Sequence, residues 1–367
     1  MEQLSIRLQP VTLKVKQAED LPSLREYQEE AIKNWKENDY CGIFEMATGT
    51  GKTYTALSAI WELLRERERL FVIISCPFIH LAEQWQDEAE KFSLDSILVG
   101  ESKALWEEDT ARQAQLFNRG KIDRVILITT NASFTSKSFQ SIIAPCLEET
   151  LLIIDEVHYA GAYTIRKLLP QNCKYRLGLS ATPERHGDEE GTKALFDYFD
   201  SVVFSFPIEK AIGVFLTPYY YHAIPVELTN EEFEEYCLLT NQIICLVGKT
   251  DALSRDRLEK LSIKRARIQN NSINKLNWIR QNIETLPLEY SLFYVGDQIF
   301  DEVKQLLGKE LRLKVHEFTS RQSRAERKKL LKEFSQQKIQ SLIAMKCLDE
   351  GVDVPPTRVA FFSGKLQ

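Results

Sequence analysis

Short apolar runs separated by amphipathic stretches recur along the first part of the chain. Several of the stretches between them place apolar residues at helical spacing, as at 54–64 and 81–92. Short, continuous apolar runs are typical of parallel strands that helices cover on both faces. The pattern therefore predicts an α/β fold with a mostly parallel sheet. The expected strands lie at 42–45, 70–77, 96–99, 124–129, 151–154, 175–179 and 202–206.

The same alternation resumes near residue 291, which predicts a second, smaller α/β unit. Between the two units the pattern predicts a strand at 219–228 and helices at 229–249 and 252–284. In the second unit we expect strands at 292–295, 314–318, 340–345 and 358–362, and helices at 299–307 and 323–335. The predicted divisions are an N-terminal extension (1–22), a first lobe (23–216), a linker and helical segment (217–290) and a second lobe (291–367).

The N-terminal region carries weaker signals. Residues 4–16 partly alternate apolar and polar positions, which predicts an added edge strand or hairpin, with Pro10 at a turn or edge. Ser23 or a neighbour is expected to cap a helix at 24–32.

The stretch at 46–53, Met-Ala-Thr-Gly-Thr-Gly-Lys-Thr, joins a predicted strand to a predicted helix. A glycine-rich turn in this context aims backbone N–H groups at phosphate oxygens, and the helix N-terminus adds partial positive charge. We expect Lys52 to reach the β- and γ-phosphates and Thr53 to hold Mg²⁺. The first Gly of the general phosphate-loop pattern is replaced by Met46. The alternative is a glycine-rich turn without a ligand, so other residues must decide.

Polar residues follow two of the predicted strands. Asp155 and Glu156 come directly after the strand at 151–154, and Ser180 comes after the strand at 175–179. Ligands bind at the carboxyl ends of strands in such sheets. Asp155 would hold Mg²⁺, usually through a water, and Glu156 would orient and deprotonate the attacking water. Two solvated acids are the alternative, but their place about 100 residues after Gly-Lys-Thr favours ATP hydrolysis.

Composition narrows the class of protein. No apolar run approaches the ~20 residues of a membrane span, and the N-terminus lacks a signal-peptide pattern. The seven cysteines are scattered and form no C-x-x-C pair, which indicates a reducing compartment without disulfides or a zinc site. We therefore expect a cytoplasmic protein, or a nuclear one if the source is eukaryotic.

The net charge of −6 argues against a uniformly basic, nucleic-acid-binding surface. Two stretches are locally basic: 255–280 carries eight Lys or Arg residues and two acids, and 321–332 carries six and one. Each stretch is either a polynucleotide contact or, more often for such runs, a solvated helix face.

Taken in order, these motifs resemble those of superfamily-2 helicases and translocases, with Asp-Glu-Val-His as a variant of the Asp-Glu-x-His box. That family prefers Ala-Thr-Gly-x-Gly-Lys-Thr, which explains the missing first Gly. The resemblance implies tandem RecA-like lobes of the P-loop NTPase class. It favours the DNA-directed branch, with XPB-like excision-repair helicases and the motor subunits of type I and type III restriction enzymes. The further matching stretches are Leu24-Arg25-x-Tyr27-Gln28, Pro77 with Leu81, Gln84 and Trp85, Thr129-Thr130-Asn131, Ser180-Ala181-Thr182-Pro183, 292–295 and Gly351-x-Asp353-x-Pro355.

The resemblance assigns roles to these residues, with ATP and Mg²⁺ as the cofactors. A Gln amide can pair with adenine N6 and N7, so Gln28 would select ATP. The implied nucleotide-binding set is Arg25, Gln28, Thr48, Gly49, Thr50, Gly51, Lys52, Thr53, Gly351 and Asp353, and Lys52, Asp155 and Glu156 are the implied catalytic residues. The implied coupling residues are His158, Ser180 and Thr182, and the implied nucleic-acid contacts are Pro77, Gln84, Thr129 and Thr130.

Several of these residues could instead have purely structural roles. Arg25 would stack on the base or form an ion pair on a helix surface. The coupling residues would otherwise cap strand ends. Trp85 and Trp106 would stack on bases or, as is more common, pack in the core.

Motif VI of the family, a Gln-x-x-Gly-Arg-x-x-Arg-like run that supplies arginine fingers, does not occur in the sequence. An arginine finger contributes ~10³–10⁵ in turnover. Three explanations stay open: the sequence is truncated within the second lobe, which we favour, another chain supplies the arginines, or hydrolysis is weak. We therefore expect an incomplete second lobe and a chain that binds nucleotide but turns it over poorly.

The sequence thus predicts an ATP-dependent DNA helicase or translocase that acts in DNA repair or restriction. The predicted partners are single- or double-stranded DNA, with RNA as the alternative, and other protein subunits, but not a membrane. Two alternatives stay open. One is an ATP-switched, nucleic-acid-binding subunit of a larger nuclease or defence complex, and the other is an RNA helicase.

Overall fold

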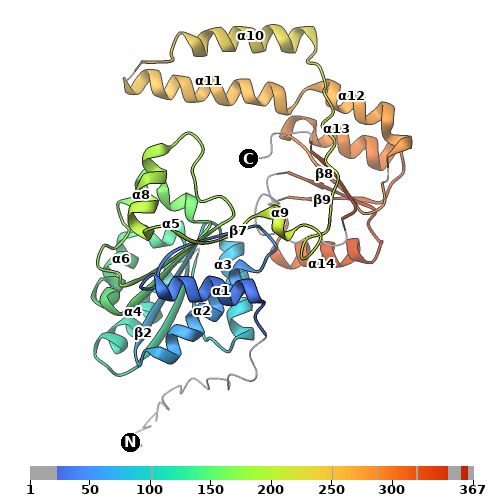
Figure 1. Cartoon of the computed structure of the whole chain (residues 1–367). Helices are drawn as coiled ribbons and strands as arrows, with labels where there is room; N and C mark the ends of the chain where they lie inside the picture. The colour runs from blue at the N-terminus through green and yellow to red at the C-terminus, as the bar shows by residue number, and fades with distance from the viewer. Residues whose placement is uncertain are drawn as a thin grey trace, which may run out of the picture. The chain divides into compact units, whose positions relative to one another are not determined.

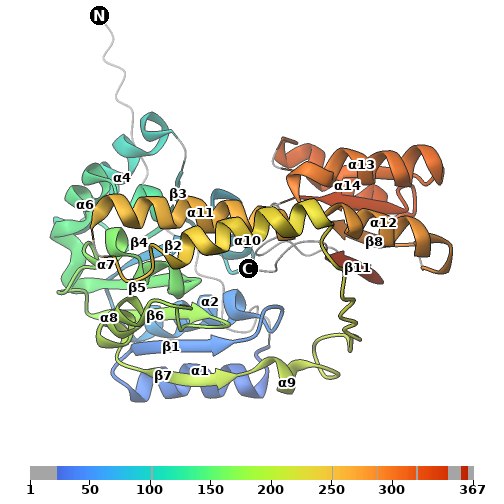
Figure 2. The same cartoon turned by 90° about the horizontal axis from the view of Figure 1, so that it is seen from above.

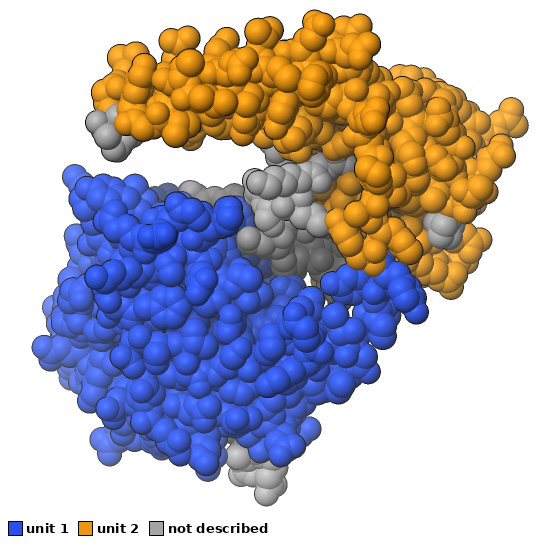
Figure 3. Space-filling view, turned by 45° about the horizontal axis from the view of Figure 1, so that its top comes forward, with its two compact units in different colours: residues 1–220 blue, residues 221–367 orange. Residues whose placement is uncertain are grey.

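The chain divides into two compact units in the computed structural model, Met1–Tyr220 and Tyr221–Gln367 (Figure 3). Each unit contains a parallel sheet (Figure 1). We call them the first and the second unit. The structure describes residues 23–100, 102–249, 251–286, 288–319, 321–345 and 357–362. The edge strand or hairpin predicted at 4–16 lies outside these residues.

The first unit is built on a seven-stranded sheet with the order β3-β4-β2-β5-β6-β1-β7, and all of its pairings are parallel. This confirms the predicted fold class and the seven expected strand positions. β5, β6 and β1 are neighbours, so the three turns that follow them emerge at one edge of the sheet. The strands are β1 (Cys41–Met46), β2 (Leu70–Cys76), β3 (Ile97–Val99), β4 (Arg124–Thr130), β5 (Thr150–Asp155), β6 (Tyr175–Ser180) and β7 (Val202–Phe206).

Helices cover both faces of this sheet, as Figure 1 shows. The helices α1 (Glu26–Glu37), α2 (Lys52–Glu66) and α3 (Ile79–Lys91) cover one face. The other face is covered by α4 (Lys103–Asn118), α5 (Asn131–Phe134), α6 (Lys137–Ile143) and α8 (Glu189–Phe199). Shorter elements are η2 (Ala144–Glu149), η3 (Val157–Gly161), α7 (Tyr163–Arg166) and α9 (Ile208–Ala211).

β2 shows why its sequence is apolar throughout. Val72 and Ile74 enter the core beneath α1 to α3, whereas Phe71 and Ile73 enter the core on the opposite face. Successive residues of a strand point to opposite faces, so a strand covered on both sides needs apolar residues at every position. Burial of each such side chain stabilises the folded state by roughly 1.5–3 kcal/mol.

The second unit contains a four-stranded sheet with the order β11-β8-β10-β9, again with parallel pairings. α12 and α13 pack on one face of it and α14 on the other. α10 and α11 lie side by side (Figures 1 and 2). The strands are β8 (Ser291–Tyr294), β9 (Val315–Phe318), β10 (Ser341–Ala344) and β11 (Val359–Phe362), and the helices are α10 (Asn230–Ile244), α11 (Ala252–Asn270), α12 (Ile273–Asn282), α13 (Phe300–Gln305) and α14 (Arg324–Ser335). The short turns η4 (Ile283–Thr285), η5 (Asp297–Ile299) and η6 (Leu306–Glu310) complete it.

The strand predicted at 219–228 is wrong. These residues carry no regular structure, and Tyr219, Tyr220 and Tyr221 are 63%, 91% and 75% exposed. Aromatic residues favour strands because they pack against cross-strand neighbours, and among the described residues no strand pairs with this segment.

The single helix predicted at 252–284 is also wrong, because α11 ends at Asn270 and α12 begins at Ile273. Asn271 donates its side-chain N–H to the carbonyl of Arg267 at 3.0 Å. Asn and Ser side chains compete for backbone groups in this way, which favours helix ends over helix interiors. At the other end of the chain, α1 begins at Glu26 with Arg25 as its N-cap rather than Ser23. In the part of the chain that the structure describes, no helix is both long enough and apolar enough to cross a membrane.

Gly178 in β6 offers a test of the tight packing at the centre of the first sheet. A Cβ atom there would lie 3.0 Å from Val157 Cγ2 and 3.1 Å from Ile43 Cγ1. Gly178→Ala should therefore lower the free energy of unfolding by ~1–3 kcal/mol. Urea unfolding followed by tryptophan fluorescence measures it, because four of the five tryptophans lie in the first unit. Leu105→Ala, at an 82% exposed position of α4, is the control and should change stability by less than ~0.5 kcal/mol. Equal stability of the two variants would contradict the expected crowding.

Candidate nucleoside triphosphate site

The turn between β1 and α2 has the backbone conformation of an anion cradle. Gly49 and Gly51 have φ values of +82° and +87°, a region that L side chains rarely adopt. α2 begins at Lys52, immediately after Gly51. Thr50 is fully buried, and its hydroxyl donates to the carbonyl of Ala47 at 2.6 Å. Successive N–H groups and the start of a helix therefore meet at the end of β1, an arrangement that suits a phosphate.

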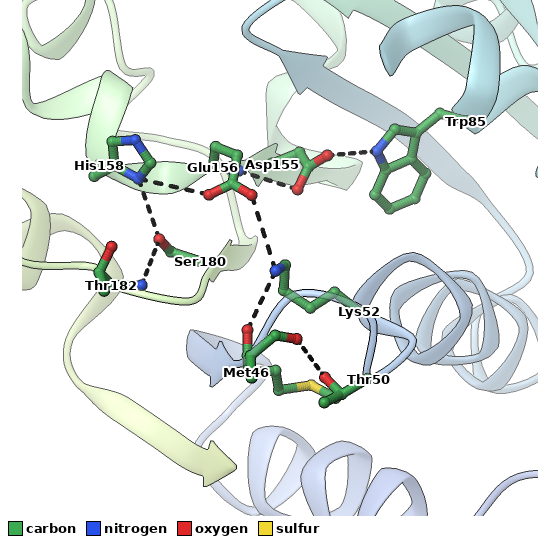
Figure 4. A network of polar contacts seen from close by, with 10 residues as sticks. Met46, Thr50, Lys52, Trp85, Asp155, Glu156, His158, Ser180 and Thr182 are labelled. Atoms are coloured by element: carbon green, nitrogen blue, oxygen red, sulfur yellow. Dashed lines mark hydrogen bonds and ion pairs between the residues drawn. The ribbon is translucent and has the colours of Figure 1, made fainter. Parts of the chain in front are cut away.

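Lys52 extends from the start of α2 toward the end of β5 (Figure 4). Its Nζ donates to the carbonyl of Met46 at 3.2 Å and lies 3.8 Å from Glu156 Oε1. The side chain of Lys52 is only 10% exposed. A largely buried cation between the turn and a carboxylate can neutralise a phosphate that enters the same space. Thr53 follows as the second residue of α2 and is partly buried, whereas Thr48 in the turn is exposed.

Asp155 ends β5, and donors hold both oxygens of its carboxylate. Oδ1 accepts the backbone N–H of Glu156 at 3.0 Å, and Oδ2 accepts the indole N–H of Trp85 at 2.8 Å. Burial, with the neighbouring Glu156 charge as the second cause, raises the pKa of Asp155 to about 6. The contact with Trp85 was not predicted. The available signal was its position on the helix after β2, because β2 is the neighbour of β5 in the sheet.

Glu156, His158 and Ser180 form a polar network between the ends of β5 and β6 (Figure 4). Glu156 has left-handed backbone angles, φ +46° and ψ +60°. His158 Nδ1 lies 3.6 Å from Glu156 Oε2 and 3.1 Å from Ser180 Oγ. Ser180 Oγ also accepts the backbone N–H of Thr182 at 3.1 Å. The three predicted coupling residues are thus brought together beside Glu156.

Burial sets the protonation of this network. Burial raises the pKa of Glu156, and the charge of Lys52 and a hydrogen bond from Ser180 partly offset this rise. Burial, followed by the positive charge of Arg185, lowers the pKa of His158. A carboxylate with a raised pKa accepts a proton more readily from a nearby water. Because the single hydroxyl proton of Ser180 is donated to Glu156, His158 Nδ1 can form its hydrogen bond with Ser180 Oγ only as an N–H donor.

α1 docks on the phosphate turn through Tyr27 and Gln28. The Tyr27 hydroxyl donates to the carbonyl of Thr50 at 2.6 Å. Gln28 is 4% exposed, its Oε1 accepts the N–H of Arg25 at 3.0 Å, and its Nε2 lies 2.8 Å from where a Cβ on Gly51 would stand. Gln28 thus caps α1 and lies against the phosphate turn, and its contact with adenine stays a prediction.

Arg25 makes a contact that neither sequence interpretation anticipated. Its guanidinium carbon lies 4.2 Å from the ring centroid of Phe215, and its Nη1 donates to the Tyr27 hydroxyl at 3.2 Å. The Tyr27 ring stacks on Phe206 with centroids 4.2 Å apart. Phe206, the last residue of β7, and Phe215, which follows β7, therefore complete an aromatic cluster beside the phosphate turn.

The predicted nucleic-acid contacts differ in exposure. Pro77 is partly buried at the end of β2, and Gln84 is exposed on α3. Thr130 is the N-cap of α5 and accepts the N–H of Ser133 at 3.1 Å. Thr129 is fully buried, and its hydroxyl donates to the carbonyl of Thr130 at 3.2 Å. The structure therefore does not present the Thr129 side chain to a polynucleotide, which corrects that prediction.

The remaining sequence predictions concern metal ligands and the second unit. Gly351 and Asp353 lie outside the described residues. Among the residues that are described, no cluster of three or more His, Cys, Asp or Glu side chains could hold a metal ion by itself. Mg²⁺ usually binds through one or two carboxylates together with substrate phosphates and waters. Asp155, which ends β5, and Thr53, the second residue of α2, offer a carboxylate and a hydroxyl that fit that kind of site. Trp85 and Trp106 are 1% and 4% exposed, which confirms that both belong to the core.

Two known protein families match parts of this chain. Residues 21–185 match the family described as "Type III restriction enzyme, res subunit". Residues 274–364 match the family described as "Helicase conserved C-terminal domain". The first match contains the phosphate turn and the polar ends of β5 and β6, and the second contains all four strands of the second sheet.

Individual relatives are similar along most of the chain. The "DNA 3'-5' translocase XPB2" of Sulfurisphaera tokodaii is 27% identical, and the alignment covers 94% of this chain and 75% of the relative. The "Putative DNA 3'-5' helicase Rad25" of Haloarcula marismortui is 23% identical over 94% of this chain, which spans only 48% of that relative. The solved structure of the "ATP-dependent Type ISP restriction-modification enzyme LlaBIII bound to DNA" superposes with a TM-score of 0.60 and 17% identity, over 94% of this chain and 26% of that one. This last likeness bears on the fold and agrees with tandem RecA-like units.

The raised pKa of Asp155 predicts a pH dependence of stability. Because the pKa rises from 3.8 to about 6, the native state holds this proton more tightly than the unfolded chain does. The protonated Asp155 carboxyl therefore stabilises the fold at low pH. As the pH rises from about 4 to about 6, this stabilisation is lost, and the free energy of unfolding falls by ~3 kcal/mol. Asp155→Asn removes the titrating proton, so in Mg²⁺-free buffer it should gain stability relative to wild type over this interval. Urea unfolding at pH 4.5 and pH 7 measures the gain. A wild-type-to-variant difference that is the same at both pH values would count against the buried, shifted carboxyl.

Proposed function

The chain belongs to the superfamily-2 helicases and translocases, on the branch with XPB-like proteins and restriction-enzyme motor subunits, and we propose that it couples ATP hydrolysis to movement along DNA. It is an ATP hydrolase of this class. The proposal concerns the residues that perform the hydrolysis, the metal ion they use and the polynucleotide on which the protein acts.

The assignment of the catalytic residues rests on one observation. The phosphate turn after β1 and the Asp155-Glu156 pair after β5 emerge at the same edge of one parallel sheet, and Lys52 Nζ lies 3.8 Å from Glu156 Oε1. Lys52 would hold the β- and γ-phosphates in place of its present contacts. Glu156, whose pKa is raised by burial, would orient the attacking water and accept its proton.

Thr53 and Asp155 would hold Mg²⁺, because a hydroxyl and a carboxylate are oxygen ligands of the kind that this ion takes. When bound, it would neutralise charge on the β- and γ-phosphate oxygens and so stabilise the transition state. Thr53 would offer its hydroxyl, and Asp155 would offer an ionised carboxylate, usually through a water. The positive charge of the phosphate-bound cation favours that ionised form against the burial that raises the pKa of Asp155.

The network of His158, Ser180 and Thr182 is suited to report the state of Glu156 to the end of β6. Each of its contacts is a directional hydrogen bond or close polar contact, so a shift of Glu156 toward a water would change the partner of His158. We assign these residues to coupling, and Pro77, Gln84 and Thr130 to contact with the sugar–phosphate backbone. Such contacts hold a polynucleotide without reading its sequence.

The relatives support DNA as the polynucleotide. The printed names of both archaeal relatives describe DNA translocation or DNA helicase activity, and the first matching family is described from a restriction enzyme. We further assign residues 23–216 to the first helicase lobe, 217–290 to a linking helical segment and 291–367 to the second lobe. Gly351 and Asp353 would complete the nucleotide contacts from that second lobe.

Lys52→Ala and Glu156→Gln should separate binding from chemistry. Lys52→Ala removes the cation for the phosphates, so it should weaken binding of a fluorescent ATP analogue and lower turnover by ~10²–10³. Glu156→Gln keeps the shape of the side chain but not its basicity, so binding should persist while turnover falls by ~10²–10⁴. Binding titrations and single-turnover ATP hydrolysis measure the two effects.

The controls are Lys33→Ala and Glu37→Gln, on the exposed face of α1 with side chains 72% and 67% exposed. Both should leave binding and turnover within about twofold of wild type, because surface substitutions away from a site usually act weakly. Undiminished hydrolysis in either Lys52→Ala or Glu156→Gln would refute the role assigned to that residue.

Polynucleotide specificity follows from the same proposal. Double- or single-stranded DNA should raise the ATPase rate, and RNA of matched length and sequence should raise it less. The measurement is the hydrolysis rate against polynucleotide concentration at fixed salt, because phosphate contacts weaken steeply with salt. Greater stimulation by RNA would favour an RNA helicase. Tight, ATP-dependent DNA binding without any stimulation would instead indicate an ATP-switched subunit of a nuclease complex, in keeping with the restriction-enzyme match.

A further inference from the structure

Trp85 reaches the nucleotide site from a helix that otherwise covers the face of the sheet. It lies on α3, is 1% exposed, and donates its indole N–H to Asp155 Oδ2 at 2.8 Å (Figure 4). α3 follows β2, and β2 pairs with β5 in a register that places Ser75 opposite Ile154. α3 therefore begins at the edge of the sheet where β5 ends, and the indole of Trp85, in the second turn of α3, reaches the Asp155 carboxylate.

The other indoles of the first unit make a different kind of contact. Trp35 donates to the carbonyl of Arg176 at 2.9 Å, Trp61 to that of Phe92 at 3.0 Å and Trp106 to that of Gly100 at 3.2 Å. Each of these bonds satisfies a buried N–H with a backbone acceptor, as is usual for tryptophan in a core. Trp85 instead donates to a carboxylate that ends a strand beside the phosphate turn.

The indole limits how the Asp155 carboxylate can turn. The N–H of Glu156 holds Oδ1, and the N–H of Trp85 holds Oδ2. Hydrogen bonds to an ionised acceptor are short and strong, and in a buried site there is little water to replace a lost donor. Without the indole N–H, the hydrogen bond from the Glu156 N–H alone would hold the carboxylate, so rotation about its Cβ–Cγ bond would be less restricted. Groups that hold a metal ligand in this way commonly tune metal affinity.

We propose that Trp85 is a positioning residue, whose indole N–H fixes the Asp155 carboxylate in the orientation that binds the Mg²⁺ of the bound nucleotide. The inference rests on the proposed function, in which Asp155 serves that ion. It assigns to Trp85 a role beyond its place in the hydrophobic core. Trp85 would touch neither the nucleotide nor the metal and would act only through Asp155.

Trp85→Phe tests this role, because it keeps an aromatic ring in the core and removes the N–H. Binding of a fluorescent ATP analogue is titrated with Mg²⁺, and the Mg²⁺ midpoint should rise about tenfold in the variant. Affinity for the analogue in EDTA should stay within about twofold of wild type, because the phosphate turn is intact. Trp106→Phe removes a similarly buried indole from its bond to Gly100 and should leave the midpoint unchanged.

A double-mutant cycle with Asp155→Asn separates positioning from a purely structural effect. If Trp85 acts through Asp155, adding Trp85→Phe to Asp155→Asn should change the Mg²⁺ midpoint by less than about twofold. Incorporating benzothienylalanine at position 85 provides a second variant, since it keeps the bicyclic shape and lacks the N–H. It should reproduce the tenfold shift even if Trp85→Phe folds poorly.

The outcomes distinguish this inference from the function on which it rests. A wild-type protein whose nucleotide binding ignores Mg²⁺ would contradict the proposed metal site itself. If nucleotide binding by the wild type depends on Mg²⁺, the variants test Trp85 alone. Its role would be overturned if the Mg²⁺ midpoint were the same in wild type, in Trp85→Phe, with benzothienylalanine at position 85 and in Trp106→Phe. A full tenfold shift that persists in the Asp155→Asn background would also overturn it, because the effect would not pass through that carboxylate.

Discussion

The nucleotide site depends on the parallel pairing of β5, β6 and β1. In-step register places Asp155 opposite Leu179 of β6 and Glu45 of β1 opposite Ser180 of β6. Parallel strands all end at the same edge, so turns that are far apart in the sequence meet there without any long connection. The two apolar cores on either side of the sheet maintain this register, because a one-residue slip would exchange the side chains of the two faces.

The ionisable groups at that edge are arranged for a ligand that carries both negative phosphates and a cation. Asp155 and Glu156 are adjacent, both have pKa values raised by burial, and Lys52 Nζ lies 3.8 Å from Glu156 Oε1. Two buried carboxylates beside one ammonium group form a costly arrangement in isolation, because desolvation penalises each charge. Polyphosphate with Mg²⁺ would supply a partner for Lys52 and a positive charge for Asp155. The same features that reduce stability therefore prepare the site for its substrate.

Several side chains have two roles that burial alone does not distinguish. Trp85 is a core residue by exposure and a donor to Asp155 by direction. Gln28 caps α1 and also lies against Gly51 of the phosphate turn. Tyr27 stacks on Phe206 and donates to the carbonyl of Thr50. Amphipathic side chains of this kind link the packing of the helices to the geometry of the site. A change in the packing therefore alters the site, and a change in the site alters the packing.

The sequence by itself determined the strands of both sheets, the phosphate turn and the acidic pair after β5. Continuous apolar runs and a glycine-rich turn are local signals that depend on neighbouring residues alone. Only the tertiary structure decided that 219–228 forms no strand, that Thr129 is hidden and that the Trp85 indole meets Asp155. Each of these depends on what lies across space: a strand needs a partner, exposure depends on the covering helices, and a hydrogen bond requires a donor that is 70 residues away in the chain.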